Sequence, residues 1–126
     1  MCIRDRGKPL NATLQLALEA WSGQLPPGFA LAAAGHIHIW EVLSFKDKGA
    51  PQFVLGNGGT LLTHKVERKL KGLKVGGREV DDARTSHKWG FTLFTPATDG
   101  WTATAYSVKG KDKFECSVAQ GVVSCP

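Results

Sequence analysis

The sequence predicts an α/β fold, of the α+β kind, in which a helix packs against layered β-sheets. Three observations support this prediction: a helical apolar stripe near the N-terminus, a fully apolar run at residues 29–34, and a β-rich final third that ends in a hairpin. A helix, a short link and a buried strand form an αβ unit, and an antiparallel meander extends a sheet. We therefore expect the C-terminal half of a layered αββα sandwich.

The predicted helix runs from about Asn11 to Trp21, and Asn11 is a favourable N-cap residue. Apolar side chains recur at the i, i+3, i+4 and i+7 positions, so that one face of the helix is suited to a core. These positions are Leu14, Ala17, Leu18 and Trp21. Ser22-Gly23 and Pro26-Pro27 then end the helix.

The run Phe29–Ala34 is apolar at every position, which is typical of a central strand covered on both faces. An extended segment is expected at Ile39–Phe45, and a short apolar strand at Gln52–Leu55. This strand leads into the turn Gly56-Asn57-Gly58-Gly59. Amides in such a turn can cradle an anion, although a strained loop at a strand end is the commoner explanation.

The final third predicts an antiparallel meander with turns at residues 96–100 and 109–112. Its strands are expected at Trp89–Thr95, Trp101–Val108, Phe114–Val118 and Val122–Cys125. The last two flank Gln120-Gly121, which suits a two-residue hairpin turn.

This hairpin predicts a disulfide bond between Cys116 and Cys125. Pairing centred on Gln120-Gly121 sets Val118 opposite Val123, Ser117 opposite Ser124, and the two cysteines opposite each other. Directly opposed positions at a non-hydrogen-bonded site lie within reach of a disulfide. Such a bond implies an oxidising compartment, whereas the alternative is two reduced, half-buried cysteines.

The composition, with 42% apolar and 21% charged residues, is typical of a soluble globular protein, and a length of 126 residues corresponds to one domain or part of one. No apolar stretch is long enough to span a bilayer. Much of the net charge of +5 lies in residues 65–78, which we interpret as a solvated basic loop rather than a nucleic-acid site. Residues 1–6 have the character of a translated sequencing-adapter artefact, so residues 7–126 are expected to be the C-terminal part of a longer domain.

The segment Gly35-His36-Ile37-His38 directly follows the apolar run and is the candidate metal site. Histidines two residues apart on extended backbone point to the same side, so His36 and His38 can reach one ion or two adjacent ions. Imidazole nitrogens suit zinc, iron or manganese. The other histidines, His64 and His87, are interpreted as surface or structural residues. Trp40 either lines a substrate cleft or caps the core.

Several segments follow one another in an order that is typical of a known enzyme superfamily. They are the apolar strand, the histidine segment, residues 51–60, Trp89-Gly90-Phe91 and Gly100-Trp101-Thr102. The chain resembles the C-terminal part of the calcineurin-like metallophosphoesterases, the superfamily that includes the purple acid phosphatases. The resemblance covers most of residues 8–118, and its chemistry rests on Gly35-His36-Ile37-His38. Gly56, Asn57 and Gly58 support it without being catalytic.

The resemblance implies a hydrolase in which two metal ions (zinc, manganese or iron) bridge a hydroxide that attacks a phosphate ester. His36 would ligate the second ion and His38 the first. The family's upstream ligand motifs (Asp-x-His, Gly-Asp-x-x-Asp and Gly-Asn-His-Glu) are absent from this chain, and so are its catalytic residues. We therefore expect a longer parent to be the enzyme, secreted or periplasmic, and this chain to be inactive by itself.

Two other interpretations remain open. A cupin-type metal-binding β-barrel also uses His-x-His, but its glutamate comes four or five residues later, whereas Glu41 follows His38 by three. A non-catalytic secreted binding module, stapled by the hairpin disulfide, would leave His36 and His38 as packing residues.

Overall fold

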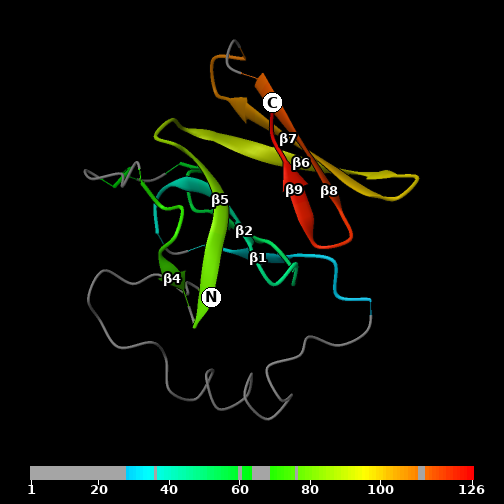
Figure 1. Ribbon diagram of the computed structural model, residues 1–126. Helices are drawn as coiled ribbons and strands as arrows, with labels where there is room; N and C mark the ends of the chain where they lie inside the picture. The colour runs from blue at the N-terminus through cyan, green and yellow to red at the C-terminus, as the bar shows by residue number, and fades with distance from the viewer. Residues whose placement is uncertain (1–27, 36, 60, 64–68, 76, 111–112) are drawn as a thin grey trace.

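A computed structural model describes residues 28–35, 37–59, 61–63, 69–75, 77–110 and 113–126 of the chain (Figure 1). In this part of the chain the regular elements are all strands, arranged in two sheets. The strands are β1 (Ala32–Ala34), β2 (Trp40–Phe45), β3 (Gln52–Leu55), β4 (Lys74–Val75), β5 (Arg78–Ser86), β6 (Gly90–Ala97), β7 (Gly100–Ser107), β8 (Lys113–Ala119) and β9 (Val122–Ser124).

The first sheet has five strands in the order β1-β3-β2-β5-β4. β1 and β3 run parallel, with Ala33 opposite Phe53, and the other neighbours are antiparallel. Every residue of β2 is buried, which fits its place in the middle of the sheet. Its side chains alternate between two clusters, because successive side chains of a strand point to opposite faces. Trp40 and Val42 belong to one cluster, whereas Leu43 and Phe45 belong to the other.

The second sheet is an antiparallel meander in the order β6-β7-β8-β9. It packs on the Trp40 face of the first sheet (Figure 1). The buried residues of this shared core are Trp40, Val42, Phe53, Ala103, Ala105, Cys116, Val118 and Val123. Small side chains on β7 leave room for the large rings of the first sheet, so the two inner faces fit together.

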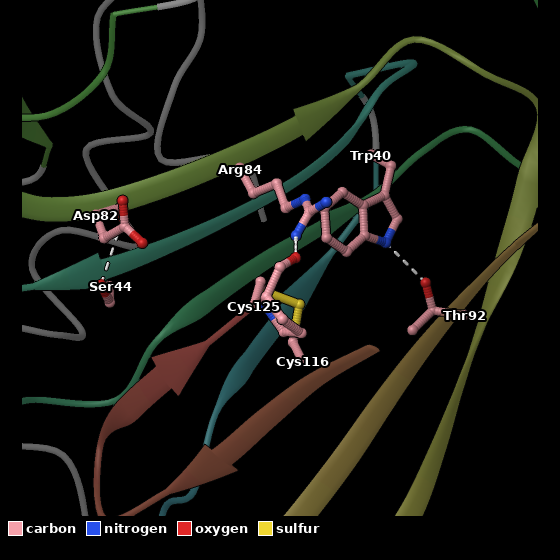
Figure 2. The surroundings of a disulfide bond; sticks show 8 residues. Trp40, Ser44, Asp82, Arg84, Thr92, Cys116 and Cys125 are labelled. Carbon is pink, nitrogen blue, oxygen red and sulfur yellow. Dashed lines mark hydrogen bonds between the residues drawn. A yellow bond between two sulfur atoms is a disulfide. The ribbon is translucent and has the colours of Figure 1, made fainter. Parts of the chain in front are cut away.

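The terminal hairpin has the predicted register. Ser117 pairs with Ser124 and Val118 with Val123, and the serines are exposed while the valines are buried. Gln120 (φ 49°) and Gly121 (φ 77°) both have positive φ, as a type I′ turn requires. The structure joins Cys116 and Cys125 in a disulfide whose Cα atoms are 4.2 Å apart. Figure 2 shows this bond beside Arg84, which donates to the carbonyl of Pro126 and lies 4.6 Å over the Phe114 ring.

The predicted α/β fold class is wrong, because the described residues form an all-β arrangement of two sheets. The helix expected at residues 11–21 lies outside the described residues. The αβ unit was inferred from the apolar run Phe29–Ala34, but β1 covers only Ala32–Ala34 and is an edge strand rather than a central one. Alanine is small and Phe29 is 43% exposed, so this run buries far less than its composition suggests. No helix in the described part is long and apolar enough to cross a membrane.

The sequence also failed to predict β5, which pairs with the central strand β2. Residues 65–78 were interpreted as a basic loop, yet Lys74–Val75 and Arg78 belong to strands. β5 is mostly polar, and among its residues only Val80 is buried. Hydrophobic alternation is therefore too weak to reveal this strand, whose place comes from backbone pairing with β2.

A bidentate ion pair fixes the β2–β3 turn to the start of β5. The Arg78 guanidinium donates to both carboxylate oxygens of Asp47, over 2.7 and 2.6 Å, and to the Ala50 carbonyl over 3.2 Å. The hydrogen bonds that Arg78 donates to the carboxylate lower the pKa of Asp47 to about 2. The guanidinium also lies 3.8 Å above the Phe45 ring. The turn and the missed strand are thus held together by charge as well as by packing.

Replacing both hairpin cysteines tests the disulfide. For a crosslink between residues nine apart, the chain-entropy account gives about 2–3 kcal/mol of stabilisation. We expect Cys116→Ala/Cys125→Ala to lose at least this much free energy of unfolding in urea titrations under oxidising conditions. Adding a reductant should destabilise the wild type and leave the double variant unchanged. Equal stability of the two proteins under oxidising conditions would show that the bond contributes nothing.

Candidate functional site

Strand directions bring several predicted site residues to one end of the five-stranded sheet. The parallel strands β1 and β3 both end there, at Ala34 and Leu55. β2 begins there, since Trp40 pairs with both Leu55 and Ser86, and Ser86 is the last residue of β5. We name this end the histidine end, made of Gly35 and residues 37–39, 56–59, 61–63 and 86–89. The described residues of the predicted metal segment (Gly35, Ile37 and His38), the glycine-rich turn and His87 all lie in it.

His38 is half-buried, and its orientation is fixed by the backbone of residues 61–63. Its Nδ1 lies 2.6 Å from the carbonyl oxygen of Leu61, and its own carbonyl accepts a hydrogen bond of 2.9 Å from the amide of Thr63. A carbonyl oxygen can only accept, so Nδ1 must carry the proton. In the neutral imidazole, Nε2 is then the nitrogen with a lone pair available to a ligand.

The other histidines have different outcomes. His36, the first histidine of the motif, lies outside the described residues, and so does His64. His87 is exposed between β5 and β6, and its Nε2 donates to the carbonyl of Thr63. The structural role expected for His87 therefore has a specific partner, and this partner belongs to the same three-residue segment that orients His38.

Gly56 is needed for close packing against the histidine segment. A Cβ at this position would lie 1.9 Å from the carbonyl oxygen of Ile37 and 3.3 Å from the Cα of His38. The amide of Gly56 also donates to the Ile39 carbonyl over 3.0 Å. Only glycine permits this approach, so Gly56 shapes the backbone around His38. Gly35 differs, because a Cβ there would meet nothing within 4 Å.

Asn57 connects the two sheets rather than offering a ligand. It is buried, its Nδ2 donates to the Lys88 carbonyl over 3.0 Å, and its carbonyl accepts from the Gly90 amide over 3.1 Å. These bonds tie the end of β3 to the start of β6. Asn57 therefore has a structural role in joining the two sheets. A Cβ built on the next residue, Gly58, would lie 3.9 Å from the Gly90 carbonyl oxygen.

Trp40 belongs to the core, since it is only 1% exposed. Of the two roles considered for it, the core role is the one observed. Its ring contacts Phe53 and Phe114 edge-on, and its Nε1 donates to Thr92 Oγ1 over 2.8 Å. Glu41, the residue weighed for a cupin-type site, is 3% exposed on the neighbouring position of β2.

The described residues hold no group of three or more histidine, cysteine, aspartate or glutamate side chains that could bind a metal ion. His38 itself fits the chemistry of a ligand, because one ring nitrogen is anchored and the other is unprotonated when the ring is neutral. The segment that anchors it was not predicted, since a backbone carbonyl leaves no pattern in a sequence. Comparison with protein families, curated proteins and solved structures finds no match to this chain.

The contrast between the two motif glycines gives a stability test. Gly56→Ala should cost about 1–3 kcal/mol of folding free energy, because its methyl group would displace the Ile37 carbonyl. Gly35→Ala has open space and should change stability by less than about 0.5 kcal/mol. Urea titrations of both variants measure the difference. Equal effects would mean that the histidine segment is not packed against Gly56 as described.

Proposed function

We propose that this chain contributes the histidine ligand segment of a dinuclear metallophosphoesterase, as its resemblance to the calcineurin-like enzymes implies. The observation that carries the proposal is the state of His38. Its Nδ1–H is anchored on the Leu61 carbonyl, which leaves Nε2 to coordinate. Metal-binding histidines commonly donate their second ring nitrogen to a backbone carbonyl or carboxylate in this way.

The histidine end supports the same proposal through its assembly. The sequence predicted the His36–His38 segment and the Gly56-Asn57-Gly58 turn as separate features. Parallel pairing of β1 and β3 brings the glycine-rich turn and the described residues Ile37 and His38 to one end of the sheet, and Gly56 packs against the backbone of Ile37 and His38. This shaping is expected where a ligand must be held in one position.

Within the proposed site, His38 would bind one ion through Nε2 and His36 would bind the other. When bound, the ions would activate water and stabilise negative charge on the phosphoryl oxygens of a phosphate ester. The chain's own part is to hold the ligands and orient them. Zinc, manganese and iron all suit imidazole nitrogen. Aspartate- and asparagine-bearing segments absent from the printed sequence would supply the other ligands.

A disulfide between Cys116 and Cys125 is compatible with an extracellular location. We propose more specifically that the protein is secreted or periplasmic, where such bonds persist.

Metal binding tests the role of His38. Titration with Co²⁺, followed by its visible absorption, should show weak binding by the wild-type chain, because two histidines are fewer than the roughly four ligands of a tetrahedral site. His38→Ala should weaken binding by roughly 10-fold or more, on the scale of losses at metal sites. His64→Ala, a histidine outside the motif, is the matched control and should bind like the wild type. Unchanged affinity in His38→Ala would remove the basis of the proposal.

Hydrolysis of an aryl phosphate with added Mn²⁺ tests the proposed reaction. We expect no turnover by this chain, because it lacks the other ligand segments of a two-metal site. A longer form carrying those segments should be active and should lose activity on His38→Ala. Robust turnover by the 126-residue chain, or full activity of His38→Ala in the longer form, would contradict the proposal.

A further inference from the structure

Hydrogen bonds to His38 and His87 help to hold residues 61–63 at the histidine end. The Leu61 carbonyl accepts from His38 Nδ1, the Thr63 amide donates to the His38 carbonyl, and the Thr63 carbonyl accepts from His87 Nε2. Leu61 is 79% exposed, so its side chain adds little burial. Polar contacts therefore contribute to the position of the Leu61 carbonyl that orients His38, and one of these contacts comes from His87.

His87 is well placed to act as such an anchor. The preceding residue, Ser86, is paired with Trp40 at the end of β5. On the other side, the Lys88 carbonyl and the Gly90 amide are both bonded to Asn57. The backbone around His87 is thus fixed to both sheets, although the residue itself is exposed. A ring carried on this backbone can hold a more weakly packed segment in place.

We infer that His87 is a positioning residue for His38. His87 holds Thr63, the 61–63 segment then presents the Leu61 carbonyl, and this carbonyl keeps the proton of His38 on Nδ1. The positioning itself is independent of any metal. The effect of this positioning on metal binding, which would occur at Nε2 of His38, rests on the proposed function.

The tautomer of His38 gives a direct readout. Long-range ¹H–¹⁵N NMR of the whole chain, at a pH where the ring is neutral, distinguishes the Nδ1–H from the Nε2–H form. The wild type should show His38 as Nδ1–H. His87→Ala should convert this single form into a mixture of the two, because the Leu61 carbonyl is no longer held. His87→Gln retains an N–H donor and should restore the Nδ1–H form.

Leu61→Ala is the matched control, since it removes an exposed side chain but keeps the carbonyl, and it should leave His38 as Nδ1–H. Retention of the pure Nδ1–H form in His87→Ala, or its loss in His87→Gln, overturns the inference. If His87→Ala fails to fold, as judged by its amide spectrum, His87→Phe, which keeps a ring but has no N–H donor, replaces it and should give the same mixture of forms.

Co²⁺ titration of the same variants separates this inference from the proposed function. If His38 is a ligand, His87→Ala should weaken Co²⁺ binding by roughly 10-fold, the scale on which supporting residues affect metal sites. A tautomer mixture with unchanged Co²⁺ affinity would support the positioning role and count against His38 as a ligand. An unchanged tautomer with reduced affinity would contradict the positioning role.

Discussion

Burial of Trp40 is the constraint on which the described structure depends. This ring lies at the start of the central strand β2 and is almost completely buried between the sheets. It meets Phe53 of its own sheet and Phe114 of the opposite sheet edge-on, with centroids 6.5 and 4.6 Å away. Its indole nitrogen is paired with Thr92 of β6, so burial leaves no polar cost there. The Trp40 side chain therefore contacts residues of both sheets.

The same constraint reaches the candidate site because His38 lies two residues before Trp40. Ile39 and Trp40, the next two residues, are both buried, and Trp40 is paired with Leu55, so the chain that leaves His38 enters the core directly. Asn57 and the hairpin disulfide tie other parts of the second sheet to this core. Arg84 lies over the Phe114 ring and donates to the Pro126 carbonyl, beside the disulfide (Figure 2). A rigid core thus supports an end of the sheet where the proposed ligand is oriented mainly by hydrogen bonds.

Hydrophobic alternation and turn residues predicted the strands and turns that depend mainly on neighbouring residues in the sequence. The strand at Gln52–Leu55, the meander and the register around Gln120-Gly121 all followed from alternation and turn chemistry, and they are confirmed. The fold class was wrong because the alanine-rich run before Gly35 has the composition of a central strand and the place of an edge strand. β5 was missed because its polar residues are stabilised by pairing with β2, which a sequence pattern does not show. At the candidate site, the sequence singles out His38 and Gly56 as motif residues. It does not reveal the contacts of His38 with the Leu61 carbonyl and of His87 with the Thr63 carbonyl, because a backbone acceptor leaves no sequence pattern.

The central claim is that the His38 ring presents Nε2 as a metal ligand while Nδ1 is held by Leu61. Anomalous diffraction at the zinc edge, on crystals of the chain soaked with Zn²⁺, tests this most directly. The account predicts an anomalous peak about 2.0–2.1 Å from His38 Nε2, with the Leu61 hydrogen bond intact. Zinc bound to Nδ1 with that bond broken, or zinc bound elsewhere on the chain and absent from His38, would contradict it.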